Sequence, residues 1–129
     1  MLPGIKLFDL TGRAAIITGG SKGLGAAMAE GLASAGANVL LVSRNLEEAQ
    51  AVADEIASGY GVKTAAIVAD VSNPADVDAM VAKAINEFGK IDILFNNAGI
   101  NIRGPIDELS YEEFRKVQDI NVDGVWLCA

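Results

Sequence analysis

Four short apolar runs alternate along the chain with longer segments of helical periodicity, and this alternation constrains the fold most. The runs are Ala14 to Thr18, Asn38 to Val42, Lys63 to Ala69 and Ile91 to Phe95. The first two lack alternating polar residues, which is typical of strands buried on both faces. Helical connections between such strands cross over with a right hand, so the pattern predicts an α/β fold with a parallel sheet covered on both faces.

The expected helices lie between these runs and after the last one. They are Gly23 to Ala35, Leu46 to Ser58, Pro74 to Phe88, and a final helix that begins after Ser110. Asn73 is a plausible N-cap for the third helix, with Pro74 at its first position. Ser110 and Glu113 have the spacing of a capping box. We expect Gly36, Gly59, Gly61 and Gly89 to end the first three helices.

Composition excludes several kinds of partner and chemistry. With 129 residues the chain has the size of one domain, and its net charge of −7 argues against a general attraction to nucleic acid or anionic membranes. No apolar run approaches the length of a membrane span. There is no His and one Cys, so a disulfide framework, a His/Cys zinc site and a His base are excluded. We expect no metal and a cytoplasmic location.

A glycine-rich turn, Thr18 to Gly25, joins the first strand to the first helix. Glycine there permits a sharp turn, the close approach of a pyrophosphate and close packing of helix on strand. The helix start offers unpaired N–H groups to phosphate. The spacing Gly-x-x-x-Gly-x-Gly differs from Gly-x-Gly-x-x-Gly, and the Gly-Lys-Ser/Thr ending of a P-loop is absent. We expect a dinucleotide site here, with a purely structural turn as the alternative.

Three further motifs follow this turn in order. After Thr18-Gly19-x-x-x-Gly23-x-Gly25 come Asp70-Val71, Asn96-Asn97-Ala98-Gly99 and Asn121-Val122. With these motifs the chain resembles the short-chain dehydrogenase/reductase family from about Phe8 to its end. The resemblance implies a Rossmann-like doubly wound parallel sheet, truncated after the fourth strand and its following helix. It also implies hydride transfer between a nicotinamide cofactor and a small-molecule carbonyl or secondary alcohol, and a homo-oligomer, a dimer or tetramer at full length.

The residues expected to bind the cofactor follow the four strands. They are Gly19, Ser21, Lys22, Gly23, Leu24 and Gly25, then Ser43, Arg44 and Asn45, then Asp70 and Val71, and finally Asn97, Ala98 and Gly99. By resemblance, Asp70 binds the adenine amino group, Val71 contacts the adenine ring, and the last three residues lie behind the ribose. The alternatives are that Asp70 only starts a turn and that the Asn-rich segment is an ordinary turn.

Ser43 decides which nicotinamide cofactor we expect. It stands where an acidic residue holds the ribose 2′-hydroxyl of NAD, and a carboxylate there would repel a 2′-phosphate. Arg44 can bind that phosphate through its planar guanidinium, and Lys22 adds a second positive charge. We therefore expect NADP(H) rather than NAD(H). A solvated Arg44 between strand and helix is the alternative.

Asn121 is the one catalytic residue expected in this sequence. Asn is a mediocre helix former and can open a water site in a helix. In the family this Asn bends the helix and holds a water in the proton relay to the catalytic Lys; a surface Asn in an imperfect helix is the alternative. No Tyr-x-x-x-Lys occurs in the sequence. The residue four positions after Tyr111 is Arg115, and Lys63 is only three positions after Tyr60.

Members of the family are longer, and the chain ends within the helix that carries Asn121. We expect residues 1–129 to be the NADP(H)-binding N-terminal half of a single-domain enzyme that lacks the catalytic Ser, Tyr and Lys and is inactive alone. A non-catalytic nucleotide-binding or structural fragment that self-associates is the alternative. Residues Asn96 to Pro105 resemble gluconate 5-dehydrogenases, and 3-oxoacyl-ACP reductases are a close second possibility.

Overall fold

The computed structural model describes residues 2–129, in which four parallel strands form one sheet in the order β3-β2-β1-β4. The strands are β1 Ala14–Thr18, β2 Asn38–Ser43, β3 Thr64–Val68 and β4 Ile93–Phe95. In the register, Ile16 of β1 lies between Leu40 of β2 and Leu94 of β4. This order matches the first four strands of a doubly wound sheet, so the predicted Rossmann-like α/β fold is confirmed.

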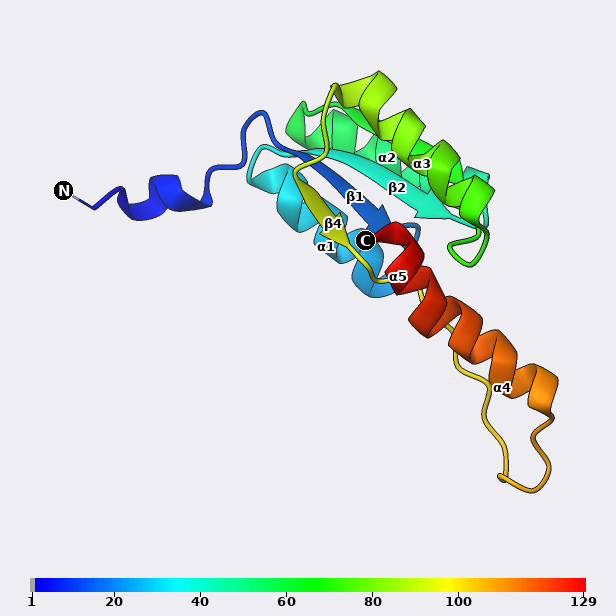
Figure 1. Cartoon of the computed structure of the whole chain (residues 1–129). Helices are drawn as coiled ribbons and strands as arrows, with labels where there is room; N and C mark the ends of the chain where they lie inside the picture. The colour runs from blue at the N-terminus through cyan, green and yellow to red at the C-terminus, as the bar shows by residue number, and fades with distance from the viewer. Residues whose placement is uncertain (1) are drawn as a thin grey trace.

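Helices connect the strands and follow the last one (Figure 1). The connecting helices are α1 Gly23–Ser34, α2 Leu46–Tyr60 and α3 Pro74–Phe88. A 3-10 helix, η1 Gly4–Phe8, precedes β1. After β4 come α4 Tyr111–Gln118, the π-helix η2 Asp119–Asp123 and α5 Gly124–Cys128. Among residues 2–129, no helix combines the length and apolar character that crossing a membrane requires.

The helices cover both faces of the sheet because alternate side chains of the inner strands point to opposite sides. One face carries Ala15, Ile17, Val39, Leu41 and Ala66, which pack against Ala29 and Ala33 of α1 and Ala49, Ala53 and Ile56 of α2. The other face carries Ile16, Leu40, Val42 and Ala65, which pack against Val77, Met80 and Ala84 of α3. Leu127 and Cys128 of α5 pack at the margin of this second cluster.

Local capping sets most helix boundaries where the sequence places them. Asn73 Oδ1 accepts the Ala75 N–H at 3.0 Å, with Pro74 at the start of α3. Ser110 and Glu113 form the predicted capping box of α4. The expectation that Gly59 ends the second helix is wrong, because α2 continues to Tyr60 and ends at Gly61, whose backbone is left-handed.

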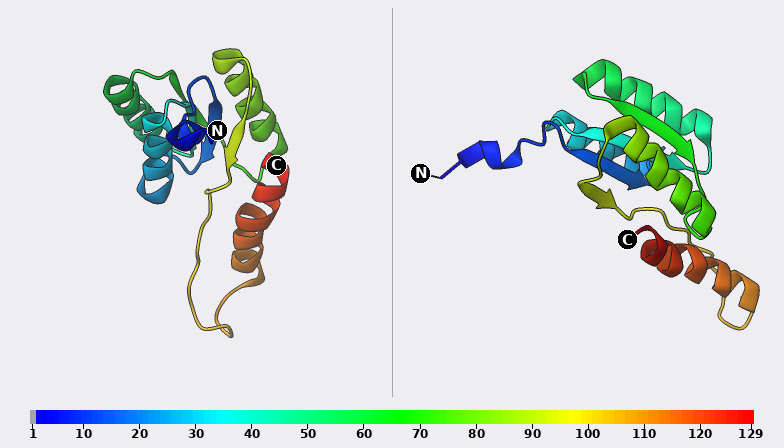
Figure 2. Two further views of the ribbon diagram at one scale, coloured as in Figure 1. Left: turned by 90° about the vertical axis from the view of Figure 1, so that its left-hand side faces the viewer. Right: turned by 45° about the horizontal axis from the view of Figure 1, so that its top comes forward.

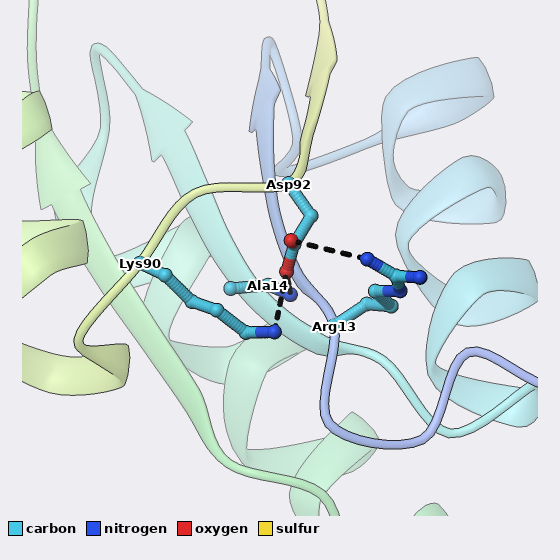
Figure 3. A network of polar contacts seen from close by, with 4 residues as sticks. All are labelled: Arg13, Ala14, Lys90 and Asp92. Atoms are coloured by element: carbon cyan, nitrogen blue, oxygen red, sulfur yellow. Dashed lines mark hydrogen bonds and ion pairs between the residues drawn. The ribbon is translucent and has the colours of Figure 1, made fainter.

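The fourth strand is shorter than predicted, and Asp92 lies directly before its first residue (Figure 3). Its carboxylate accepts the Ala14 N–H at 2.8 Å. In a regular ladder a backbone carbonyl of the neighbouring strand would accept that N–H. The same carboxylate pairs with Arg13 at 3.4 Å and Lys90 at 3.2 Å. The Asp92 N–H donates to the Ala14 carbonyl at 2.8 Å, the register with β1 runs from Ile93 to Phe95, and β4 lies at the edge of the sheet.

Two segments extend away from the sheet in opposite directions. The N-terminal segment with η1 extends beyond the start of β1 (Figure 1). The loop after β4 and helix α4 extend beyond the carboxyl ends of the strands (Figure 2). The residues that follow the strands therefore lie between the sheet and this second extension.

Candidate functional site

A cleft of about 560 Å³ lies at the carboxyl ends of the four strands. It lies across the point where the chain reverses its direction of winding, between β1 and β4, which is where open α/β sheets bind ligands. Eleven of the predicted residues line it: Gly19, Ser21, Lys22, Ser43, Arg44, Asn45, Asp70, Val71, Asn97, Ala98 and Gly99. Sequence reasoning did not assign Val42, Glu48, Ala69, Ile100 and Ile120 to a cofactor site, but they line the cleft too.

Gly23, Leu24 and Gly25 do not line this cleft. Gly23 has a φ of +56°, a left-handed conformation that favours glycine at the start of α1. A Cβ on Gly25 would overlap the carbonyl oxygen of Gly19. These glycines therefore shape the turn and hold α1 close to the end of β1, while the exposed Leu24 points to neither the core nor the cleft lining.

The buried Thr18 hydroxyl joins the end of β1 to the end of β4. It accepts the N–H groups of Asn97 and Ala98, each at 3.0 Å, and donates to the Phe95 carbonyl at 3.3 Å. The Asn97 amide donates to the carbonyls of Thr18 and Gly19, both at 3.1 Å. Both amide hydrogens of Asn97 are thus used within the protein, and its side chain fixes the glycine-rich turn relative to β4.

A chain of hydrogen bonds connects the glycine-rich turn to the end of β2. Ser43 donates to Ser21 Oγ at 3.0 Å, and Ser21 donates to Glu48 Oε2 at 3.3 Å. The Asn45 N–H donates to Ser43 Oγ at 3.1 Å, and Asn45 Oδ1 caps α2 by accepting the Glu48 N–H at 3.2 Å. One feature of the sequence could have pointed to Glu48 as a lining residue. It stands three residues after Asn45, the N-cap of a helix that follows a strand.

The cations and the one carboxylate predicted from the sequence face this cleft. Lys22 and Arg44 are exposed, and neither forms an ion pair within residues 2–129. The pKa of Asp70 is lowered chiefly by the Ser72 hydroxyl, with the Ser72 N–H and the charge of Arg44 adding to it. Both Ser72 groups donate to Oδ1 of Asp70, at 2.6 and 2.9 Å, and within residues 2–129 no donor reaches Oδ2.

Asn121 lies in the π-helix and does not line the cleft, although Ile100 and Ile120 beside it do. Its Oδ1 accepts the Ile100 N–H and its Nδ2 donates to the Ile100 carbonyl, both at 2.8 Å. This two-point contact ties the helix to the loop after β4. The i→i+5 winding at this position agrees with an Asn that disturbs its helix.

A family model described as short chain dehydrogenase matches residues 13–129, almost the whole chain. The chain belongs to the short-chain dehydrogenase family. It is 42% identical over 118 residues to 3beta-hydroxysteroid dehydrogenase 1 of Eggerthella lenta, covering 92% of this chain and 45% of the relative. It is 40% identical over 123 residues to gluconate 5-dehydrogenase of Gluconobacter oxydans, covering 93% of this chain and 46% of the relative.

The fold agrees with that of a solved reductase complex. L-sorbose reductase from Gluconobacter frateurii, crystallised with NADPH and L-sorbose, has a TM-score of 0.88 and 35% identity to this chain. The match covers 92% of this chain and 45% of the reductase. This short-chain dehydrogenase chain thus spans about half the length of the curated relatives it matches.

The donor set of the cleft fits a nicotinamide dinucleotide. Such a ligand carries a diphosphate, which suits the glycine-rich turn and the start of α1, since helix N-termini attract anions. It also carries ribose hydroxyls and an adenine amino group, which need polar partners such as Ser43 and Asp70. Lys22 and Arg44 offer two cations for any further phosphate of the ligand.

Proposed function

We propose that residues 1–129 form the NADP(H)-binding portion of a single-domain short-chain dehydrogenase. The full enzyme would transfer hydride between the nicotinamide and a carbonyl or secondary alcohol. The observation that carries the proposal is the pair Lys22 and Arg44, two cations without ion-pair partners among the described residues, on a cleft where Ser43 replaces an acidic residue. Charge-assisted bonds from Arg to phosphate are stronger than neutral hydrogen bonds, which favours NADP(H).

Each strand end has a proposed role toward the cofactor. The Gly19 to Gly25 turn and the start of α1 hold the diphosphate, while Arg44 and Lys22 hold the 2′-phosphate beside Ser43. Asp70 offers Oδ2 to the adenine amino group, because Ser72 already occupies Oδ1. Val71 contacts the ring, and Ala98 and Gly99 lie behind the ribose. The nicotinamide, when bound, supplies or accepts the hydride.

Asn121 is proposed to keep a water near the reacting groups through the widened helix rather than through its side-chain amide. Both ends of that amide are already bonded to Ile100. The substrate class we propose is a sugar or sugar acid, on the likeness to gluconate 5-dehydrogenase, with 3-oxoacyl thioesters as the second candidate. A cytoplasmic homo-oligomer remains our prediction for the whole enzyme.

Cofactor titration tests the proposal directly. We expect the chain to bind NADPH at least about tenfold more tightly than NADH, the size of one charge-assisted contact. The Arg44→Asp variant should reverse that order, because a carboxylate after β2 repels the phosphate and accepts the 2′-hydroxyl. Isothermal titration calorimetry with both cofactors gives the two dissociation constants.

Arg103→Asp is the matched control for this titration. Arg103 is exposed in the loop after β4 and does not line the cleft, so the same change of charge there should leave the order intact. Tighter binding of NADH than of NADPH by the unaltered chain would contradict the proposed preference.

A further inference from the structure

We propose that Glu48 limits the preference of this cleft for NADP(H) over NAD(H). Its carboxylate places a negative charge, and a fixed direction of hydrogen bonding, beside the ribose 2′ position. The inference rests on the proposed function and concerns a residue that neither the motifs nor the composition singled out.

The contacts of Glu48 connect it to the end of β2. Its Oε2 accepts the Ser21 hydroxyl at 3.3 Å, and Ser21 Oγ in turn accepts the Ser43 hydroxyl at 3.0 Å. Ser43 is the last residue of β2, the position where an acidic residue holds a ribose 2′-hydroxyl in NAD-binding folds. The Glu48 carboxylate, in the first turn of α2, is therefore linked through Ser21 to Ser43. Ser43 stands at the position where NAD-binding folds carry an acidic side chain.

The direction of these hydrogen bonds follows from the chemistry of a carboxylate. An ionised carboxylate only accepts, so Ser21 must donate its single hydroxyl hydrogen to Glu48. Ser43 must then donate to Ser21. Neither hydroxyl retains a hydrogen for a phosphate, which is itself an acceptor. Both still have lone pairs for a ribose hydroxyl, which can donate, so this arrangement suits the unphosphorylated ribose of NAD(H).

Charge acts in the same direction. A phosphate in contact with Ser21 would lie within about 6 Å of the Glu48 carboxylate, the span of two consecutive contacts of hydrogen-bond length. At that separation two negative charges repel measurably even in a solvated cleft. Lys22 and Arg44 contribute two positive charges to the lining, Asp70 and Glu48 contribute two negative charges, and Glu48 is the carboxylate bonded to Ser21. We infer that the cleft prefers NADP(H), but by a smaller factor than its two cations alone would give.

Glu48→Gln tests this inference, with Glu47→Gln as its matched control. The side-chain amide of the E48Q variant can donate to Ser21 Oγ, which releases the Ser21 hydroxyl hydrogen for a phosphate and removes the charge. Glu47 lies in the same helical turn with the same charge but does not line the cleft. Calorimetric titration at one fixed salt concentration should show the ratio of NADH to NADPH dissociation constants rising about tenfold in E48Q. In E47Q the ratio should stay within about twofold of the unaltered chain, because an exposed charge outside the cleft is screened.

The possible outcomes separate the inference from the proposed function. An unchanged ratio in E48Q, with both cofactors still bound, overturns the role of Glu48 and leaves the cofactor site standing. Equal rises of this ratio in E48Q and E47Q also overturn it, because they would show that only the overall negative charge of the protein matters. Failure of the unaltered chain to bind either cofactor overturns the inference and the proposed function together. The Glu48 side chain is exposed and its backbone N–H keeps the Asn45 cap, so E48Q should retain the far-UV circular dichroism of the unaltered chain.

Discussion

At the scale of single residues, Asp92 has the largest set of partners for one carboxylate that the structure records. It accepts the Ala14 N–H and forms ion pairs with Arg13 and Lys90, joining the start of β4 to the start of β1 (Figure 3). These contacts lower the pKa of Asp92, first through the Ala14 N–H and then through Lys90 and Arg13. The side chain is 19% exposed, so water competes only partly for the carboxylate.

The lowered pKa predicts how stability changes with pH. An Asp whose pKa is lower in the folded chain stabilises the fold above its unfolded value of about 3.9, and this contribution is lost as pH falls through the folded value. We expect Asp92→Asn to lower the urea midpoint at neutral pH, with the difference from the unaltered chain shrinking below about pH 4. Urea unfolding measured across this range checks the prediction.

Asp78→Asn is the control for the acid titration. Asp78 is exposed on α3 and makes no hydrogen bond or ion pair within residues 2–129, so its removal should leave the midpoint nearly unchanged. A difference between D92N and the unaltered chain that stayed constant at every pH would show that the Asp92 charge is not what matters.

At the scale of elements, α5 packs directly on the cleft through Gly124. A Cβ at this buried glycine would come within 2.6 Å of Val71 Cγ2 and 3.3 Å of Val71 Cβ. Val71 follows β3 and lines the cleft, so any displacement of α5 is transmitted to a wall of the candidate site.

The Gly124→Ala variant should therefore affect both stability and binding. Overpacking of this kind costs about 1–3 kcal/mol, and a displaced Val71 should weaken NADPH binding by several-fold. Gly31→Ala is the control, because Gly31 lies in α1 with open space around it and should gain about 0.5–1 kcal/mol from better helix propensity. Urea unfolding and NADPH titration measure the two effects. Unchanged binding in G124A would show that Val71 can move without consequence.

Elements whose ends depend on neighbouring residues could be predicted from the sequence. Asn73 with Pro74, and Ser110 with Glu113, cap their helices through bonds that span at most three residues. The π-helix could not be predicted in the same way. It accompanies the contact of Asn121 with Ile100, 21 residues away in the chain, and no local pattern specifies that contact.

The same distinction holds for the candidate site. Motif residues such as Gly19, Arg44 and Asp70 line the cleft because parallel strands end at one edge of the sheet. Glu48 escaped prediction because its place on the lining depends on where α2 starts and on the position of Ser21 in another loop. The Asn97 amide was expected behind a ribose, and only the structure shows that it donates to Thr18 and Gly19.

At the scale of the whole molecule, the chain combines the proposed nucleotide cleft with the absence of a Tyr-x-x-x-Lys motif, which the family resemblance implies for proton transfer. The 129 residues contain no Tyr-x-x-x-Lys, and an unperturbed phenol near pKa 10 needs an adjacent cation to act near neutral pH. We expect the chain to bind NADPH but not to consume it with ketoses, sugar acids or 3-oxoacyl thioesters. Intact mass spectrometry and the absorbance of reduced nicotinamide check this. Turnover by a chain of verified mass would show that the motif is dispensable.

The pairing of β1 with β4 also determines the order in which the molecule can assemble. β2 and β1 are separated by a single helix, whereas β4 reaches β1 only after α1, β2, α2, β3 and α3 have intervened. Closing that longer loop loses more chain entropy, and such distant contacts form late in folding. The Thr18 hydroxyl receives its Asn97 and Ala98 partners only once β4 has docked. By mass action, a ligand that contacts residues after all four strands stabilises the state in which the four strand ends have met.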